Sequence, residues 1–423
     1  MNGYKHTNLA DGINLYYIPT DKFKTSTVTI NIHQQLNKEK ATFNALLPRV
    51  LARGTSKLQS FQDISRYLQE LYGTVFSYGV KKMGEDHIIH FYFDIIDDRY
   101  VNESESLFKC VMEFAKQVIF EPLIENNGFK KEYVEQEKQN LKNSIQGLIN
   151  DKADYAVERC YQEMCKNENF GIYELGRIED IEKINEKNLY EHYLEVIHSS
   201  PIDIFVIGSV PENMARETVH RLFGIQSDKK RVYPSTDIIT NVGQVKKVEE
   251  PMEVTQGKLS LGFRTKIPAK DKRYYSLIVF NSILGGGPHS KLFNNVREKL
   301  SLAYYVFSRL ERFKGLMIIS SGIEVTNYQK ALDEILAQMD EMKKGNISEA
   351  ELNAAISSSV NNIRSLTDSA YYIADYYLGQ LVGNTEDDFE DIIKKISAVT
   401  KEDVVAISQN IELDTIYFLK NKD

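Results

Sequence analysis

The chain has 423 residues, of which 42% are hydrophobic and 26% charged, and its 52 basic and 60 acidic side chains give a formal charge of −8. This length favours two or more domains, and an acidic chain with dispersed Lys and Arg argues against a nucleic-acid-binding surface. No apolar run reaches the roughly 20 residues needed to span a bilayer, and the first residues lack the pattern of a signal peptide. We therefore expect a cytoplasmic protein that binds neither nucleic acid nor membrane.

The first half of the chain predicts strands and helices that alternate loosely. Period-two patterns indicate strands, with an antiparallel hairpin turning near Gly84 and Glu85, and apolar residues at helical spacing indicate long helices. The expected strands cover residues 25–36, 73–79, 87–95 and 202–207. The expected helices cover residues 37–53, 61–71, 103–120, 131–149, 151–165 and 186–197.

The second half repeats this order. Strands are expected at residues 258–263, 303–307, 316–325 and 415–419, and a helix at 272–284. Thr326 and Ser348 each begin a capping-box pattern, and Thr400 is placed to start the last helix. The final strands of the two halves begin 213 residues apart, at 202 and 415. We predict an α+β fold of two homologous domains, residues 1–225 and 246–423, each an antiparallel-rich sheet packed with helices. Residues 226–245, which are polar and lack a sustained period, are the expected linker.

Neither the cysteines nor the histidines are spaced as metal ligands. Cys110, Cys160 and Cys165 are a sparse, odd set typical of reduced thiols. Cys160 and Cys165 lie five positions apart on an expected helix, so they do not share a face. His87 and His90 lie on an expected strand, where an odd separation places two side chains on opposite faces.

A glycine-rich loop follows the helix expected at 272–284. Gly285, Gly286 and Gly287 permit a close backbone approach, Pro288 fixes the entry to a following helix, and Ser290 can cap it. The loop lacks the Lys-Ser/Thr ending of a phosphate-binding loop, so a nucleotide site is not expected. Two interpretations stay open: a loop that faces substrate, or a tight turn or mobile lid with only a structural role.

Arg297 and Tyr304 lie in the segment that follows the glycine-rich loop. They lie seven positions apart, and a short helix ending between them would bring a guanidinium and a phenol to one region. Both groups donate hydrogen bonds and suit peptide carbonyls or carboxylates. The alternatives are a surface ion pair of Arg297 with Glu298 and core packing of Tyr304 beside Tyr305.

The glycine-rich loop and the string Val-Arg-Glu-Lys-x-x-Leu-Ala-Tyr at 296–304 resemble the carboxyl-terminal half of the pitrilysin/insulinase-type zinc peptidases, the inverzincins. The duplicated plan is similar over nearly the whole chain. The resemblance extends to the alpha subunit of mitochondrial processing peptidase and to bacterial two-chain homologues. It implies that the chain forms one half of a clamshell.

Catalytic members of that family carry His-x-x-Glu-His on the first helix, just before a Gly-Thr pair. Counting back from Gly54-Thr55 places Ala45, Pro48 and Arg49 at the His, Glu and His positions. Alanine has no donor atom, arginine repels a divalent cation, and proline offers no base and should kink the helix. The resemblance places the third zinc ligand near Gln146, and glutamine is a poor ligand. We therefore expect no metal or cofactor in this chain.

The leading hypothesis is a non-catalytic subunit of a heterodimeric zinc metallopeptidase. Gly285, Gly286, Gly287, Arg297 and Tyr304 would bind an unstructured peptide, and a homologous partner chain with intact His-x-x-Glu-His would hold the zinc. The alternative is a structural or peptide-binding homodimer with no peptidase partner. An adjacent gene that encodes a chain of similar length with the intact motif would favour the first hypothesis.

Overall fold

The N-terminal half is built on a six-stranded sheet with the order β1-β2-β8-β3-β5-β4. The computed structural model describes residues 3–102, 105–224 and 230–422. In this sheet β2 runs parallel to β8, and the other neighbouring strands are antiparallel. Its strands are β1 (Lys5–Ala10), β2 (Ile13–Pro19), β3 (Thr25–Gln35), β4 (Val75–Met83), β5 (Asp86–Ile96) and β8 (Ile202–Gly208).

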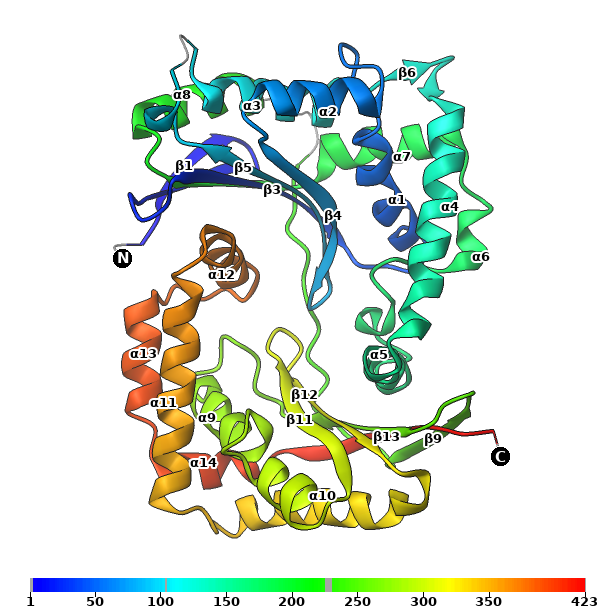
Figure 1. Cartoon of the computed structure of the whole chain (residues 1–423), viewed down its shortest axis with the longest axis vertical. Helices are drawn as coiled ribbons and strands as arrows, with labels where there is room; N and C mark the ends of the chain where they lie inside the picture. Colours follow the sequence, from blue (N-terminus) through cyan, green and yellow to red (C-terminus); the bar gives the residue numbers. More distant parts are fainter. Residues whose placement is uncertain (1–2, 103–104, 225–229, 423) are drawn as a thin grey trace.

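Helices cover the outer face of this sheet, above it in Figure 1. The helices of this half are α1 (Ala41–Leu51), α2 (Phe61–Glu70), α3 (Leu107–Phe120), α4 (Lys131–Gly147), α5 (Lys152–Met164), α6 (Ile178–Ile181), α7 (Glu186–Ser199) and α8 (Glu212–Phe223). A small ribbon of β6 (Ile124–Glu125) and β7 (Gly128–Phe129) and the 3-10 turns η1 (Asp98–Tyr100), η2 (Leu148–Asn150) and η3 (Asn169–Gly171) complete the half. Of these helices, α5 leaves its own half, as described below.

The C-terminal half has a five-stranded sheet with the order β11-β12-β10-β13-β9. Its strands are β9 (Lys246–Pro251), β10 (Gly257–Arg264), β11 (Ala303–Glu311), β12 (Leu316–Ile323) and β13 (Glu412–Lys420). Its helices are α9 (Tyr274–Gly285), the π-helical η4 (Phe293–Lys299), the 3-10 turn η5 (Val325–Asn327), α10 (Tyr328–Lys343), α11 (Glu349–Leu366), α12 (Ala370–Val382), α13 (Phe389–Ser397) and α14 (Lys401–Ser408). All the strands and helices expected from the sequence are present, with ends shifted by a few residues.

The two sheets share one strand plan. In each, a central strand (β3 or β10) pairs antiparallel with the inner strand of a hairpin (β5 or β12) and with the last strand of its half. That last strand then pairs in parallel with an earlier strand. The parallel ladders begin at Ile13 with Ile202 and at Lys246 with Thr415, so the last strands are 213 residues apart (415 minus 202), as the sequence predicts.

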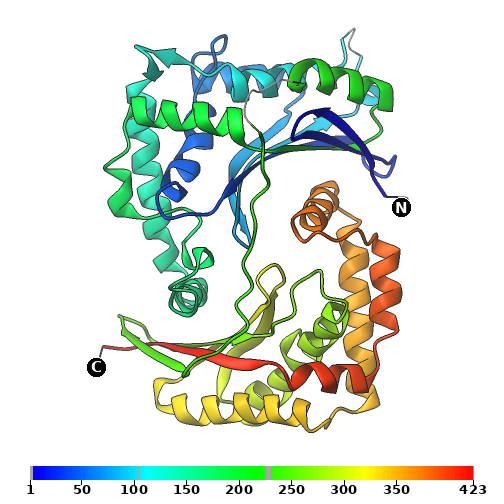
Figure 2. The ribbon, with the colours of Figure 1, turned by 180° about the vertical axis from the view of Figure 1, so that it is seen from behind.

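One helix of each half packs on the sheet of the other half. Helix α5 packs on β10, β12 and β13, and α12 packs on β3 and β8. Figures 1 and 2 show both helices between the two sheets, on opposite sides of the molecule. The Lys81 ammonium of β4 lies 2.6 Å from the Asp375 carboxylate of α12. Because α12 covers its inner face, β3 is buried at successive positions rather than at alternate ones.

The turns of the two hairpins meet between the halves. Lys314, in the turn between β11 and β12, is fully buried, and its ammonium lies 2.5 Å from Glu85 of the β4–β5 turn. It also lies 2.9 Å from the Glu168 carboxylate, which lies 2.6 Å from the guanidinium of Arg264. Buried charges need such partners, so this network fixes the approach of the two halves.

The expected linker is only partly described, because its residues 226–229 lie outside the described residues. Residues 230–245 contain no helix or strand, but they are anchored to the N-terminal sheet. Arg231 is buried and donates to the carbonyl of Ser200, and the Tyr233 hydroxyl donates to Asp203 over 2.7 Å. We propose this stretch as the connection between the two domains.

The first residues of three helices can be compared with the expected capping residues. Ser348 forms a capping box and Thr400 starts the last helix, as predicted, and Thr400 also forms a capping box there. The prediction for Thr326 is wrong: this residue lies inside η5, and α10 begins at Tyr328 with Asn327 at its N-cap. A helical turn at Thr326 removes the extended backbone that an N-cap side chain needs. Within the described ranges, we find no helix that combines the length and the apolarity required to cross a bilayer.

Candidate functional site

Helix α1 is the element on which the family resemblance places zinc ligands. It packs against β4, β5, α4 and α7, and Ala45 is only 1% exposed. Pro48 lies inside the helix but does not end it, because the Ala52 amide still donates to the Pro48 carbonyl over 3.1 Å. Proline lacks the amide hydrogen that would have reached the carbonyl of Asn44, so the helix loses one hydrogen bond there.

The side chains around these positions do not fit a zinc ion. The Arg49 guanidinium donates to the hydroxyl of Ser144 on α4 over 3.3 Å, so a fixed cation stands at the position of the second histidine. Gln146 is exposed, and Ser144, two residues earlier, is the α4 side chain that meets Arg49. Among the described residues, no group of three or more His, Cys, Asp or Glu side chains could hold a metal ion.

The histidines near α1 are buried and neutral. The Nδ1 atom of His87 lies 3.1 Å from the Asn44 side-chain amide, and the Nε2 atom of His192 lies 2.7 Å from its oxygen. Burial lowers the pKa of His87 to about 3 and that of His192 to about 4. His90, whose pKa burial lowers to about 4, is influenced by Lys81 and Asp375, a pair that links β4 to α12 on the opposite face. These rings serve packing and hydrogen bonding.

Arg297 and Tyr304 line one pocket of about 390 Å³ at the end of η4. Ser290 helps to start this short helical segment, because its hydroxyl accepts from the Phe293 amide over 3.4 Å. The Arg297 side chain is 43% exposed, lies 3.6 Å from the Glu298 carboxylate and has its guanidinium carbon 4.7 Å from the centre of the Phe293 ring. The structure therefore brings the two predicted side chains together, and it also forms the ion pair with Glu298 that was the alternative.

Tyr304 does not pack in the core. It is 50% exposed, and its hydroxyl donates to the carboxylate of Glu324, a hydrogen bond that raises the pKa of the phenol. Tyr305, its neighbour, points the other way and packs its ring against Gly322. The phenol of Tyr304 therefore stays protonated and accessible at the pocket.

The three glycines do not line this pocket. A Cβ atom on Gly285 would lie 2.6 Å from the Ser308 amide nitrogen, so this glycine lets α9 approach β11 closely. A Cβ atom on Gly286 would lie 2.7 Å from the Cα atom of Ser282. Gly287 is half-buried next to His289. The close approach that the glycines allow is to the chain itself.

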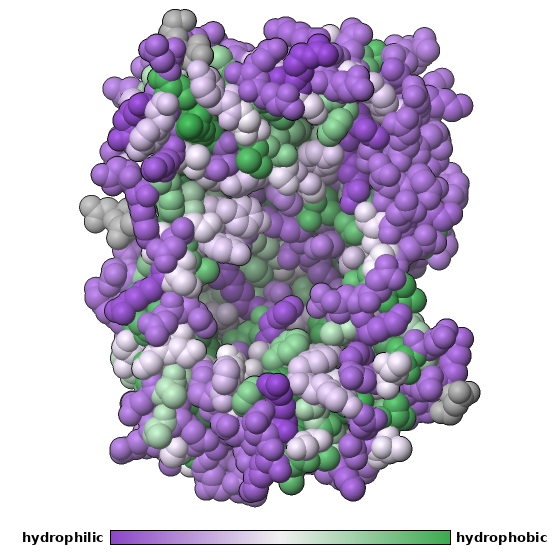
Figure 3. Space-filling view, viewed as in Figure 1, coloured by the Kyte–Doolittle hydropathy of each residue, from purple (hydrophilic) through white to green (hydrophobic). Residues whose placement is uncertain are grey.

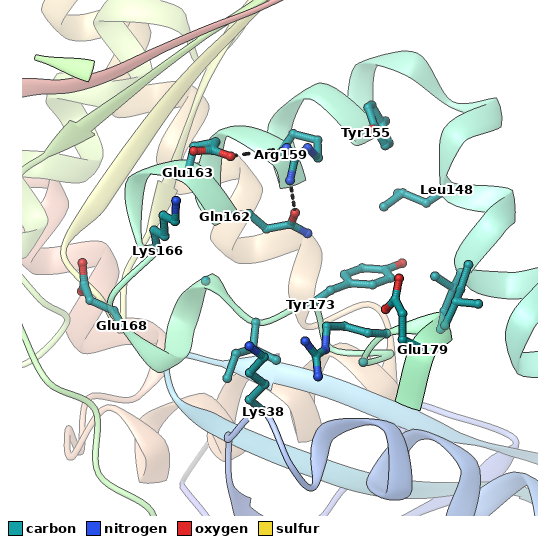
Figure 4. Close-up of a pocket in the computed structure, with 16 residues that line it drawn as sticks. Lys38, Leu148, Tyr155, Arg159, Gln162, Glu163, Lys166, Glu168, Tyr173 and Glu179 are labelled. Carbon is teal, nitrogen blue, oxygen red and sulfur yellow. Dashed lines mark hydrogen bonds and ion pairs between the residues drawn. The ribbon is translucent and has the colours of Figure 1, made fainter. Parts of the chain in front are cut away.

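A larger pocket of about 700 Å³ lies at the N-terminal end of α1. It lies between the end of α4, helix α5 and the segment 171–179, and Figure 4 shows side chains from these elements converging on it. Gly176 adopts φ of +76° against α1, and the Arg177 amide donates to the Thr42 hydroxyl over 3.1 Å. Gly176, which lines the pocket, therefore also packs against the degenerate zinc helix.

Comparison with known proteins identifies the family. The peptidase M16 inactive-domain model matches residues 183–359. The chain is 37% identical over 412 residues to the probable inactive metalloprotease YmfF of Bacillus subtilis. The alignment covers 97% of this chain and 96% of that protein. The chain belongs to the M16 peptidase family. Its resemblance to the pitrilysin/insulinase-type peptidases is thereby confirmed, and the chain is an inactive member.

Solved structures confirm the fold. A conserved protein from Enterococcus faecalis superposes with a TM-score of 0.91 at 30% identity, over 100% of this chain and 99% of that one. The peptidase M16 inactive domain from Pseudomonas fluorescens superposes with a TM-score of 0.80 at 15% identity, over 100% and 99% of the two chains. The predicted two-domain α+β architecture is correct.

The larger pocket was not expected from the sequence. Its lining residues run from Lys38 to Glu179 and come from several elements, and no local motif links them. The sequence held only an indirect signal for this pocket. The junction between two helices at residues 148–151, next to the helix that lacks its zinc ligands, marks a place where the chain must bend. By contrast, Arg297 and Tyr304 were found because one short helical segment connects them.

Proposed function

We propose that this M16 chain is the non-catalytic subunit of a heterodimeric zinc metallopeptidase and positions an unstructured peptide for a homologous partner. The partner would keep His-x-x-Glu-His and hold the zinc. One contrast carries the proposal: Ala45 and Arg49 cannot bind a metal, whereas Arg297 and Tyr304 remain together, accessible and chemically competent in the other half.

The chemistry of the smaller pocket supports this role. A guanidinium presents several donors in a fixed plane and can hold a peptide carbonyl or carboxylate, and a phenol can donate or accept at the same place. Among the described residues, Arg297 is held by the Glu298 ion pair, at 3.6 Å, and by the Phe293 ring, so most of its donors remain available for a peptide. Tyr304 would exchange its bond to Glu324 for one to the peptide.

Reconstitution tests the proposal. The chain is purified alone and together with a homologous chain from the same organism that carries the intact motif, and cleavage of a fluorescence-quenched peptide and zinc content are measured. We expect no turnover by the chain alone, and turnover by the pair that exceeds that of the partner alone. Stoichiometric zinc in the isolated chain, or a pair no more active than the partner, would overturn the proposal. A stable homodimer without a partner would instead support the structural alternative.

Substitutions in the smaller pocket test its role in the pair. Arg297→Ala and Tyr304→Phe should each lower kcat/KM by about tenfold or more, because each removes a hydrogen bond to the peptide, without dissociating the pair. Arg364→Ala and Tyr372→Phe are matched controls, since both residues are exposed in the same half but outside this pocket. Unchanged kinetics in the pocket variants would assign Arg297 and Tyr304 to structure.

We place this assembly in the cytoplasm. Cys110, Cys160 and Cys165 are all free thiols, and Cys160 and Cys165 are buried. Burial raises the pKa of Cys165 to about 12, which keeps the thiol protonated and unreactive. Free thiols of this kind are typical of a reducing compartment. Cell fractionation with an antibody to the chain is the direct measurement.

A further inference from the structure

Two of the three acidic residues that line the pocket at the N-terminal end of α1, Glu163 and Glu168, are neutralised by neighbouring cations, and the third, Glu179, is exposed. Glu163 pairs with Lys246 and lies 3.3 Å from the guanidinium of Arg159, and these contacts lower the pKa of its carboxyl. Glu168 lies within ion-pair distance of Arg264 and Lys314. Burial alone would raise the pKa of Glu168, but the hydrogen bonds from those two cations lower it. Neither carboxylate is free to bind a cationic ligand.

Two lysines of the pocket have no such partner. Arg159 and Arg177 are held by Glu250, at 3.1 Å, and by Asp180. Lys38 and Lys166 are exposed lining residues that form no ion pair with any described residue. Figure 4 shows both lysines toward one side of the pocket. The charge of Lys166 helps to lower the pKa of Glu163, but neither lysine is held in an ion pair with a described residue, so this side offers two ammonium groups to a ligand.

The opposite side of the pocket is mainly apolar and aromatic. Figure 4 shows Leu148 and Tyr155 there, with the Tyr173 ring in between and the exposed Glu179 nearby. Ile145 and Ile178 also line the pocket. A ligand that matches both sides carries an apolar group next to an anion. A cavity of about 700 Å³ is large enough for one or two residues of a peptide.

We propose that this pocket binds the carboxyl-terminal residue of the peptide, with its carboxylate at Lys38 and Lys166 and its side chain against Leu148, Tyr155 and Tyr173. The inference rests on the proposed peptide-binding function and adds a class of substrate: peptides with a free, apolar carboxyl terminus. The same chain would then hold a peptide at two places, by its end in the N-terminal half and by its backbone at Arg297 and Tyr304.

Fluorescence anisotropy of labelled peptides with the full chain tests this proposal. Two short unstructured peptides of one sequence end in leucine, one with a free carboxylate and one with a carboxamide. We expect the free acid to bind about tenfold more tightly, as one charge-assisted hydrogen bond implies. The double variant Lys38→Ala/Lys166→Ala should remove this difference and leave the affinity for the amide unchanged.

Lys109→Ala/Lys330→Ala is the matched control, because both lysines are exposed on helices outside the pocket and their removal changes net charge equally. A third peptide, amidated but with an internal glutamate, separates the terminal carboxylate from acidic side chains. Equal binding of acid and amide, equal loss in the control variant, or tight binding of the glutamate peptide would each overturn the proposal. The experiment needs no partner chain, so it can fail while reconstituted peptidase activity is retained, and the reverse outcome is equally distinguishable.

Discussion

The two halves of the molecule have the same strand plan but differ in the helix that follows the central strand. In the N-terminal half this helix is α1, a packed element in which Ala45 has become part of the core. In the C-terminal half it is α9, which ends at a glycine-rich loop and leads to Arg297 and Tyr304. The comparison teaches that the fold is held by buried apolar positions and not by zinc ligands, so chemistry can be lost from one half without loss of architecture.

A second difference lies where the halves meet. The hairpin strands pair in equivalent register, with Phe91 opposite Ile30 and Ser320 opposite Ser260, an offset of 229 residues (320 minus 91). The same offset relates Glu85 to Lys314. Equivalent positions therefore carry opposite charges and bind each other, as residues near a pseudo-twofold axis can.

Figure 3 shows a hollow between the two halves, with the hydrophilic residues gathered mostly around its outside.

The largest expected effect comes from restoring the zinc ligands. In the variant Ala45→His/Pro48→Glu/Arg49→His/Ser144→Glu, α1 and α4 would again present two imidazoles and a carboxylate. We expect about one zinc per chain, with a binding free energy on the order of 10 kcal/mol, measured by metal analysis after dialysis. Ser144→Glu alone is the control and should bind none. A folded variant without zinc would mean that the backbone of α1 and α4, and not only their side chains, no longer fits a zinc site.

The next effect concerns the contact between the halves. Lys314→Ala leaves Glu85 without its buried cation and Glu168 with Arg264 alone, and breaking a buried pair from one side costs about 3–5 kcal/mol of unfolding free energy. Urea denaturation measures the loss. Lys344→Ala removes a surface lysine that is 64% exposed and lies 3.1 Å from Glu341, so it should cost less than about 1 kcal/mol. Equal effects of the two variants would show that the network does not join the halves.

A smaller effect depends on pH and separates two buried histidines of the N-terminal sheet. Burial alone would lower the pKa of His33, but the charge of Asp86 and hydrogen bonds to Asp203 and Asp86 raise it to about 10. A raised pKa stabilises the fold fully below the ordinary value of 6.5, and this stability is lost as the pH rises toward 10. The unfolding free energy lost in His33→Gln should therefore shrink across that window, in urea titrations at successive pH values.

His87→Gln is the matched control for His33. Burial lowers the pKa of His87 to about 3, so its protonation difference between folded and unfolded states lies below pH 6.5. The effect of His87→Gln should be constant above that pH and change only in acid. A constant effect of His33→Gln from neutral to alkaline pH would contradict a charged His33.

Local patterns in the sequence were sufficient for many of the strands and helices but not for all of them, and not for their contacts. The hairpins and the long helices follow from period and turn residues. Strand β2 was missed because six successive buried residues show no alternation. Helix α12 is apolar on most sides because it packs on the sheet of the other half, and its own sequence does not name that partner. Lys314 reads as an exposed turn residue, and only the facing hairpin makes it a buried charge.

The smallest expected effect tests whether Tyr304 is kept for function rather than for packing. Tyr304 is half exposed, so Tyr304→Phe should change the unfolding free energy by no more than about 0.5 kcal/mol. Tyr305→Ala, one residue later, removes a largely buried ring that packs against Gly322 and stacks 6.0 Å from the Phe307 ring, and it should cost about 3 kcal/mol. A large loss for Tyr304→Phe in urea denaturation would place this phenol among the packing residues and leave Arg297 alone at the pocket.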